Sequence, residues 1–549
     1  MKESTWLYGL RKNQPVIPVL SPEEMRAVDA AAPHPLHVLV RSAAQALARE
    51  AVGMLGGTYG KRVFVLAGPG NNGADARVAA ELLERRGVRT EILAVSHTNP
   101  HSHDVALPSR VPRCDLVIDG AFGTGFHGSF VAPDPGDALV LAVDLPSGLD
   151  GLTGVVSEGS APMRADVTVT FAALKPGLLL GRGPQLAGRV VVADIGLDAA
   201  ASARAGVIER GDVALHVGSR RRDAHKWDAA VLVIAGSPGM SGAPLLVSAG
   251  ALRAGSGMVR LAVPGQMIAA GEAVGAAIPA EHWSGPALAV AQRCAAIVIG
   301  PGLGRVRTTR ASIRQVLTRT ALPVVVDADA LAALAPGPNE EDPRAMVRAL
   351  AGSGLAGESP TETTSGDLLP GQRAVLQAAA RRMGATPSSV AAIGRAQSAD
   401  LDAAIRGLAG RPAHSTVLTP HDGEFRMLTG HLPGADRFDE VRRLAAATGA
   451  VVLLKGPTTL VASPDGWVDV ITVGDQRLAT AGTGDVLAGV IGALLARGLT
   501  PQAAAACGAW LHGTAATRGL AAGLVAGDLP ELVAGVLTEL AEDHAGGDS

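Results

Sequence analysis

Aromatic residues and cysteines are scarce in this chain, and each scarcity excludes a class of function. Phe, Trp and Tyr make up 3% of the 549 residues, so single-stranded nucleic acid would find few stacking platforms. The three cysteines, Cys114, Cys294 and Cys507, lie far apart, which argues against a disulfide framework and against a zinc site. The net charge is −3, so no basic field attracts nucleic acid or an anionic membrane.

Long apolar runs are also missing. No apolar run reaches the roughly 18 residues that a membrane-spanning helix needs, and the first 20 residues lack the apolar core of a secretory signal. By exclusion, we expect a cytoplasmic protein that has neither nucleic acid nor membrane as a partner. We also expect it to form a homo-oligomer.

What the chain does contain is a series of short apolar runs, bounded by Gly and Pro and separated by segments of helical composition. Such runs imply a parallel sheet that is covered on both faces. The first half predicts strands at 62–67, 90–95, 115–119, 139–144, 167–171 and 190–194. The second half predicts strands at 229–235, 258–263, 296–300, 323–327, 416–419 and 451–455. The fold class is therefore α/β with two domains.

Changes in composition suggest where these domains begin and end. We expect an extension at 1–18, a first domain at 19–204, a linker at 205–225 and a second domain at 226–545. The sequence SPEEM from Ser21 predicts a helix start, because it combines a cap, an early proline and two carboxylates. Residues 336–413 include PGPNEEDP and GESPTETTSGD. That composition cannot build a core, so we predict a partly disordered surface insertion.

The sharpest local feature of the first half is FVLAGPGNNGADA, residues 64–76. It predicts a strand, a glycine-rich turn and a helix, whose N-terminal N–H groups suit a phosphate. Residues 68–73 also satisfy the weak dinucleotide pattern G-x-G-x-x-G. Asn71, Asn72 and Asp75 add side-chain oxygens that suit a cation or a ribose. A tight turn without any ligand is the alternative.

Two more loops follow predicted strands, DGAFGTGFHGS at 119–129 and VDLPSGLDGLTG at 143–154. Loops at the carboxyl ends of parallel strands share one edge of the sheet, where ligands bind. Asp119, Asp144 and Ser147 are therefore expected to converge with Asn72. An aspartate at a strand end can instead simply cap the next helix.

Together with the later T-V-T-F and K-P-G-L segments, these motifs resemble the epimerase domain of the NAD(P)H-hydrate repair enzymes, also seen in the apolipoprotein A-I-binding proteins. The resemblance covers about residues 20–200. It implies potassium ligands at Asn72, Asp119 and Ser147, and acid/base work by Asp144 at the hydroxylated ring carbon. It implies contacts with the hydrated nicotinamide nucleotide from Asn71, Asn72, Gly73, Ala74, Asp75, Gly123, Thr124, Gly125, Gly128, Ser129 and Asp144.

This half also departs from the family pattern. NNGADA replaces the usual NNGGDG and introduces Ala74 and Ala76, while LVRSAA places Arg41 where a carboxylate is usual. A lysine often found after the second strand is missing from AVSHTNP. These changes leave open that this half is a binding module without catalysis.

Three histidines, His97, His101 and His103, lie close together in the sequence. They suggest either a metal site or, more simply, an exposed loop.

In the second half, TAGTGDVLAGVIGALLARG at 480–498 predicts a glycine-rich turn that opens an apolar helix. Backbone N–H groups of residues 481–484 could form an anion hole there. Asp485 then follows where a base could deprotonate an attacking hydroxyl. The simpler interpretation of Asp485 is a helix cap.

The G-x-G-D pattern resembles the ribokinase-like fold, and four further motifs with the segment HKWDAAVLVIAGSPGMSGA (225–243) narrow the resemblance to the NAD(P)H-hydrate dehydratases. These motifs are IGPGLG (299–304), VDADAL (326–331), LTPHDGEF (418–425) and LLKGPTT (453–459). The resemblance covers about residues 205–540. It implies that the adenine nucleotide binds Lys455, Gly456, Pro457, Thr458, Thr459, Gly482 and Gly484. It implies that the hydrated nicotinamide contacts Ala243, Gly302, His421 and Asp485.

Three more carboxylates belong to this region. Glu424 is placed like the residue that helps to hold magnesium in ribokinase-like enzymes. Asp327 and Asp329 follow a predicted strand and could support the site, although loop capping explains them equally well.

The leading hypothesis is a bifunctional repair enzyme that interconverts the epimers of NAD(P)H hydrate. Its second half would dehydrate the S epimer with ADP as phosphoryl donor, giving NAD(P)H, AMP and phosphate. The expected cofactors are ADP, Mg²⁺ and K⁺. Two alternatives remain, a ribokinase-like kinase of a vitamin precursor and a dehydratase fused to an inactive epimerase-like module. An NAD-dependent dehydrogenase would rest on the lone G-x-G-x-x-G pattern.

Overall fold

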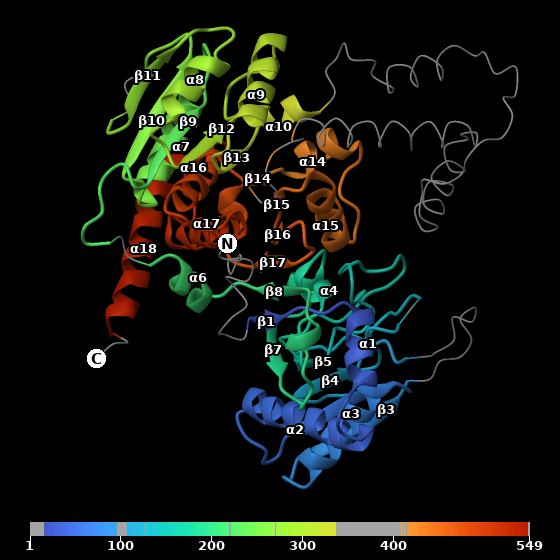
Figure 1. Ribbon diagram of the computed structural model, residues 1–549. Helices are drawn as coiled ribbons and strands as arrows, with labels where there is room; N and C mark the ends of the chain where they lie inside the picture. Colours follow the sequence, from blue (N-terminus) through green and yellow to red (C-terminus); the bar gives the residue numbers. More distant parts are fainter. Residues whose placement is uncertain are drawn as a thin grey trace, which may run out of the picture.

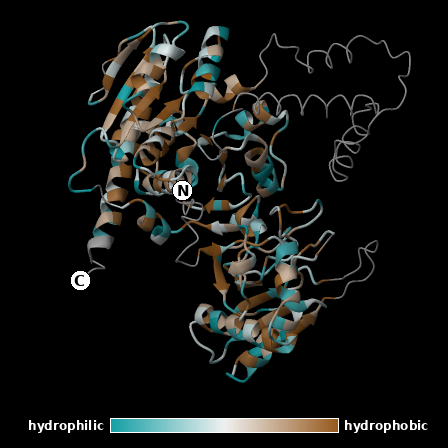
Figure 2. Ribbon diagram, in the orientation of Figure 1, coloured by the Kyte–Doolittle hydropathy of each residue, from teal (hydrophilic) through white to brown (hydrophobic). Residues whose placement is uncertain are grey.

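The chain forms two β-sheets, which lie one above the other in the computed structural model (Figure 1). The structure describes residues 16–95, 107–126, 128–218, 221–268, 271–335, 408, 411 and 415–546. Hydrophobic residues concentrate on the strands and on the helix faces turned toward them (Figure 2). No helix in these ranges is long and apolar enough to cross a membrane.

The smaller sheet has six parallel strands in the order β3-β2-β4-β5-β6-β7. They are β2 (Arg62–Ala67), β3 (Arg89–Ala94), β4 (Leu116–Gly120), β5 (Leu139–Val143), β6 (Val167–Phe171) and β7 (Arg189–Ala193). Each lies within one residue of the prediction. Apolar runs were a sufficient signal for the inner strands because these are buried on both faces, whereas the edge strand β3 is mostly exposed.

The two faces of this sheet are covered differently. Helices α2 (Leu36–Leu55) and α3 (Asn71–Glu84) pack on one face through small side chains such as Ala79. In the described residues, the opposite face is covered by loop residues that include Phe122 and Phe130. Helix α1 (Pro22–Ala30) begins as predicted, because Ser21 and Glu24 cap each other's backbone.

The larger sheet has eleven strands, and its parallel part follows the order β15-β14-β13-β12-β9-β10-β11. The strands are β9 (Ala230–Ile234), β10 (Met258–Pro264), β11 (Val274–Ile278), β12 (Ala296–Ile299), β13 (Val324–Val326), β14 (Thr416–Leu418) and β15 (Val451–Leu454). Antiparallel β16 (Thr459–Ala462) and β17 (Val468–Ile471) extend it. The fold class is therefore α/β in both halves, as predicted, although β11, β16 and β17 had escaped the sequence reading.

Helices cover both faces of the larger sheet. On one face lie α7 (Gly242–Arg253), α16 (Thr483–Ala496), α17 (Pro501–Arg518) and α18 (Leu529–Gly546). On the other lie α8 (Ser284–Ala291), α9 (Arg307–Arg319), α10 (Asp329–Leu334), α14 (Asp422–Thr429) and α15 (Arg437–Thr448). This layer arrangement leaves the carboxyl ends of the parallel strands at one common edge.

Two short strands join the halves. β1 (Ile17–Pro18) pairs antiparallel with β8 (Ala205–Val207), which in turn pairs with β17. Residues that we expected in an extension and in a linker thus belong to the larger sheet, and α6 (Arg210–His216) follows them. Strands of two or three residues carry no recognisable alternation, so only their tertiary partners reveal them.

Most of the expected insertion at 336–413 lies outside the described residues. Arg411 is described, and its guanidinium donates hydrogen bonds to the carbonyl oxygens of Leu317 (2.9 Å), Thr320 (3.0 Å) and Leu322 (2.8 Å). Burial lowers the pKa of Arg411 to about 10. The chain has therefore rejoined the second half by Arg411, slightly before the expected end of the insertion.

Candidate active sites

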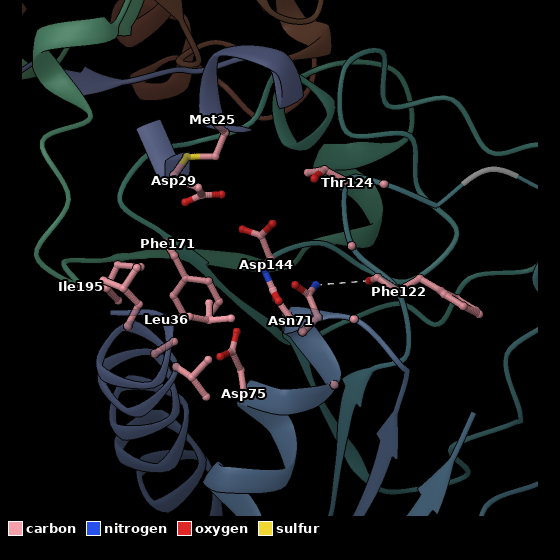
Figure 3. A pocket seen from close by; sticks show the side chains of 18 of the residues that line it. Met25, Asp29, Leu36, Asn71, Asp75, Phe122, Thr124, Asp144, Phe171 and Ile195 are labelled. Carbon is pink, nitrogen blue, oxygen red and sulfur yellow. Dashed lines mark hydrogen bonds between the residues drawn. The ribbon is translucent and has the colours of Figure 1, made fainter. Parts of the chain in front are cut away.

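A cavity of about 460 Å³ lies at the carboxyl edge of the smaller sheet, between α1, α2 and the loops after β2, β4 and β5. Figure 3 shows the side chains of Asp29, Asp75 and Asp144 projecting into it. Phe171 and Ile195 form an apolar wall beside them. The cavity therefore offers carboxylates next to a hydrophobic surface.

Asp144 occupies the centre of this cavity. It follows β5 directly and has a positive φ of 66°, a conformation that is costly for a residue other than glycine. Its Oδ1 accepts hydrogen bonds from Thr170 Oγ1 at 2.8 Å and from Lys175 Nζ at 2.5 Å. The lysine side chain is only 2% exposed. The buried ammonium stabilises the Asp144 carboxylate and fixes its orientation.

Asp75 and Asp29 flank Asp144 from two different helices. Asp75 is 5% exposed, and no hydrogen bond to its carboxyl is seen in the described part of the chain. Burial, and secondly the nearby Asp144 carboxylate, raise the pKa of Asp75 to about 7. Asp29 is exposed on α1, and burial of part of its surface raises its pKa as well.

The three predicted cation ligands meet just behind the cavity. Ser147 Oγ lies 2.6 Å from Asp119 Oδ1 and 3.3 Å from the Phe122 carbonyl oxygen. The Asn72 amide nitrogen lies 3.3 Å from the same carbonyl.

The buried charge of Asp119 makes a cation plausible on physical grounds. Asp119 is fully buried, and burial raises its pKa although hydrogen bonds from Ser147 lower it. No basic side chain pairs with it among the described residues. The Asp119 carboxylate, the Ser147 hydroxyl and the Phe122 carbonyl bring oxygen atoms together here, which fits a hard cation, whereas Asn72 turns its amide nitrogen toward the Phe122 carbonyl.

The other residues predicted for this half divide into two groups. Those that line the cavity are Asn71, Asn72, Gly73, Asp75, Gly123, Thr124, Gly125 and Asp144. Ala74, Gly128 and Ser129 are not among its lining residues. The histidines at 97, 101 and 103 lie outside the described residues.

Two of the departures from the family pattern, Ala76 and Arg41, lie away from this cavity. Ala76 is fully buried, and its methyl group faces Gly120 in the sheet. Arg41 lines a separate groove between α2 and α3. Neither side chain is among those that line the cavity. These substitutions therefore do not change the cavity wall.

Sequence reasoning assigned no role to Lys175 or Asp29. Lys175 comes shortly after β6, so its place at a strand end was a usable signal. Asp29 lies on a helix with no motif around it, and only the tertiary structure brings it to the cavity.

The second site forms where α16 begins. Gly482 has a φ of 91°, and a Cβ atom there would come within 2.6 Å of the Leu246 side chain. A Cβ atom on Gly484 would lie 3.3 Å from Lys455 Nζ. The glycines thus allow a tight turn and bring the lysine ammonium beside the N-terminus of the helix, which suits a phosphate.

Lys455 is held from the other side by a strand-end aspartate. Its Nζ lies 2.7 Å from Asp327 Oδ1, which also accepts a hydrogen bond from Thr419 Oγ1 at 2.7 Å. Burial lowers the pKa of Lys455, but Asp327 and Glu424 more than offset this and raise it above its ordinary value. Lys455 therefore remains a cation at the carboxyl ends of β13 and β15.

Asp485 lies in the first turn of α16. Burial, and then the charge of Asp327, raise its pKa to about 6. The Asp485 carboxylate accepts no hydrogen bond from a backbone N–H among the described residues, so the helix-cap interpretation has no support. A carboxylate with a pKa near neutrality is suited to accept a proton.

The His421 and Glu424 pair begins α14. His421 Nδ1 accepts from Gly423 N at 2.9 Å, and Glu424 Oε2 accepts from His421 N at 3.0 Å. The imidazole is 59% exposed, whereas Glu424 is buried, which raises its pKa. His421 is free to meet a ligand, and Glu424 directs a carboxylate toward Lys455 and Asp327.

Other residues predicted for this half make the following contacts. Gly302 and Ala243 lie together, because a Cβ atom on Gly302 would be 3.2 Å from Ala243 Cβ. Asp329 accepts from Gly304 N at 2.9 Å and from Arg305 Nε at 2.8 Å, so it does cap a loop. In the loop 456–459, Thr458 Oγ1 donates to Leu179 O at 2.5 Å and thus contacts the first half.

Sequence reasoning missed His512 on α17. Burial lowers its pKa to about 4, and its ring lies against the backbone of Thr483. No local pattern separates this histidine from the alanine-rich helix around it.

Comparison with known proteins matches both halves of the chain. A family model described as NAD(P)H-hydrate dehydratase matches residues 231–347 and 401–538. A model described as YjeF-related protein N-terminus matches residues 36–110 and 93–177. The matches thus include both groups of residues described above.

Full-length relatives carry both halves in this order. The bifunctional NAD(P)H-hydrate repair enzyme of Mycobacterium tuberculosis is 36% identical over 85% of this chain and 86% of its own. The bifunctional NAD(P)H-hydrate repair enzyme of Moorella thermoacetica is 33% identical, and the match covers 88% of this chain and 83% of that enzyme. Among solved structures, an ADP/ATP-dependent NAD(P)H-hydrate dehydratase from Bacillus subtilis, co-crystallized with ATP/Mg²⁺, is 22% identical to this chain. The match covers 61% of this chain and 98% of that chain, with a TM-score of 0.38. The chain belongs to the family of bifunctional NAD(P)H-hydrate repair enzymes.

Proposed function

We propose that this chain restores damaged nicotinamide nucleotides at two separate sites. The first cavity interconverts the R and S epimers of NAD(P)H hydrate, and the second site dehydrates the S epimer at the expense of ADP. The observation that carries this proposal is family membership over both halves, combined with a proton acceptor, Asp485, at the N-terminus of α16 beside Lys455. In this assignment, residues 19–204 are the epimerase domain and 226–545 the dehydratase domain.

Dehydration begins at Asp485. Its carboxylate takes the proton from the hydroxyl of the hydrated ring, and the oxygen attacks the terminal phosphoryl group of ADP. The N–H groups of the turn at Gly482–Gly484 and the Lys455 ammonium neutralise the charge that develops on the phosphoryl oxygens. The ring nitrogen's lone pair then expels phosphate, a much better leaving group than hydroxide. The products are NAD(P)H, AMP and phosphate.

The residues around Lys455 also suit magnesium. Mg²⁺ is usually held by one or two carboxylates together with substrate phosphates, and Glu424 directs a buried carboxylate toward this position. A bound Mg²⁺ would add positive charge next to the phosphates. The described residues contain no cluster of three His, Cys, Asp or Glu side chains that could hold a metal alone, which agrees with a nucleotide-assisted site.

Epimerisation uses the first cavity. Asp144 acts as the acid/base residue at the hydroxylated ring carbon. Lys175 and Thr170 donate hydrogen bonds that hold its carboxylate in place. Potassium would be held by Asn72, Asp119 and Ser147, where it would balance the buried charge of Asp119 and order the loops that border the cavity.

The test uses the full-length protein with a mixture of R and S NADH hydrate, ADP and magnesium, and it follows the return of NADH absorbance. Rapid recovery of the whole pool is expected. Recovery that stops when the S epimer is exhausted would remove the epimerase half of the proposal. No recovery with ADP or ATP would contradict the dehydratase, and a stable phosphorylated product would instead favour the ribokinase-like kinase.

A further inference from the structure

The first cavity contains a second buried carboxyl group that the reaction described above leaves unused. Asp75 lies on α3, across the cavity from Asp144 on the β5 loop, and both side chains point into the same space (Figure 3). Asp75 is buried, because only 5% of its surface is exposed. In the described part of the chain it pairs with no basic side chain and accepts no hydrogen bond. A buried carboxyl group with a purely structural role normally accepts hydrogen bonds.

The two carboxyl groups have opposite electrostatic surroundings. Asp144 shares its Oδ1 between Lys175 and Thr170, so the carboxylate form is stabilised. Asp75 has only burial and the negative charge of Asp144 around it, and its pKa is raised to about 7. A buried carboxyl group that faces a lysine-bound carboxylate across one cavity is suited to act as the acid beside a base.

We propose that Asp75 is the general acid of the epimerase cavity and acts with Asp144 as its partner base. This inference rests on the proposed epimerase function. Asp29 also points into the cavity, but it is exposed on α1 and remains in contact with water.

In this mechanism, Asp75 gives its proton to the hydroxyl oxygen of the hydrated ring. The carbon–oxygen bond then breaks, and water leaves with the bonding pair. The ring nitrogen's lone pair forms a carbon–nitrogen double bond. Water then adds to the opposite face of the carbon, and Asp144 takes the proton that this addition releases. The reverse passage, or proton exchange with solvent, restores both carboxyl groups.

The experiment measures conversion of the purified R epimer into the S epimer by the full-length protein without ADP, with spontaneous epimerisation subtracted. Asp75→Asn is expected to lower the catalysed rate by about 100-fold or more. Asp75→Glu is expected to recover part of it. Asp137→Asn changes an exposed carboxylate of the same half and is the matched control. Dehydration of the pure S epimer with ADP verifies that each variant has a folded second half.

The pH profile provides a readout that a structural role would not move. In the wild type, the rate should fall as pH rises through about 7, the pKa of Asp75, because the acid loses its proton. The other charged or titratable groups that face Asp75 are Asp29 and His34 from the helical side, and Asp144 and Lys175 from the sheet. The alkaline fall should persist in Asp137→Asn and disappear from the residual rate of Asp75→Asn.

Each outcome decides the question. A wild-type protein that does not accelerate epimerisation contradicts the proposed function itself. A wild type that does so, with Asp75→Asn within about two-fold of it, overturns only the role of Asp75. If Asp75→Asn does not fold, the wild-type profile decides, because a rate that stays constant through pH 8 would exclude an acid with a pKa of about 7.

Discussion

The two sites use the same pair of residue types in different ways. In each half, a lysine that follows one strand is paired with an aspartate at the end of another strand of the same sheet, Lys175 with Asp144 and Lys455 with Asp327. In the first half, the paired aspartate itself faces the cavity. In the second half, the lysine lies beside the N-terminus of α16, and the proposed proton acceptor, Asp485, is a separate residue on that helix.

This difference follows from the chemistry that each site serves. Phosphoryl transfer needs a cation and a helix N-terminus to neutralise charge, so the lysine must reach the ligand. Moving protons at a ring carbon needs carboxyl groups in defined protonation states, so the lysine stays buried behind the aspartate. The same ion pair therefore positions a base in one half and a cation in the other.

The largest expected effect separates the two activities. Asp485→Asn should lower dehydration of the S epimer by about 100- to 10,000-fold, because the general base is lost, while R-to-S conversion remains unchanged. Asp144→Asn should have the opposite pattern. Both rates are measured separately on pure epimers. Equal loss of both activities in either variant would show that the sites are not independent.

The ion pairs should also differ in their contribution to stability. Lys175→Met should lower the free energy of unfolding of the first half by about 3–5 kcal/mol, since it leaves Asp144 buried without its cation. Lys455→Met should cost less, because the Lys455 side chain is 22% exposed, whereas that of Lys175 is 2% exposed.

These two effects can be measured independently. Apart from Trp6, the tryptophans begin at Trp227, so their fluorescence reports unfolding of the second half, whereas hydrogen exchange reports the first. Lys61→Met, in an exposed pair with Asp115, is the matched control and should change stability by less than about 1 kcal/mol. An equally small effect of Lys175→Met would contradict the assigned role.

The raised pKa values imply a stability cost at neutral pH. Asp485 has a pKa of about 6 against an ordinary 3.8, so its favourable contribution is complete below pH 3.8 and is lost as pH rises through 6. Asp485→Asn should therefore stabilise the second half by about 1–3 kcal/mol at pH 7. The gain should shrink toward pH 4, as followed by fluorescence-detected denaturation. A gain that is independent of pH would point to a cause other than ionisation.

The smallest expected effect concerns the contact between the halves. Thr458→Val removes the hydrogen bond from Thr458 Oγ1 to Leu179 O and should cost about 1 kcal/mol in the free energy of unfolding. Thr459→Val, in the same loop, removes only a long 3.4 Å contact within the loop and should cost less. If the two variants unfold alike, the hydrogen bond from Thr458 to Leu179 adds no stability.

Much of the fold could be predicted from local patterns. Most strands of the smaller sheet were found within a residue because they are rich in apolar and β-branched residues and lie between turn residues, whereas the edge strand β3 is mostly exposed and contains Arg89 and Glu91. The helix at Ser21 was found because its capping pattern is local. The short strands β1 and β8 could not be found this way, since the pairing of Ile17 with Val207 joins residues that are distant in the sequence.

The same distinction between local patterns and tertiary contacts applies to the candidate sites. The sequence by itself determined which turns carry glycine and which strand ends carry Asp119, Asp144 and Lys455, because backbone geometry and turn chemistry are local. Only the tertiary structure decided that Lys175 supports Asp144, that Asp75 has no hydrogen-bond partner among the described residues, and that Ala76 faces the sheet rather than the cavity. Those outcomes depend on strand order and helix packing, which set distances between residues far apart in the chain.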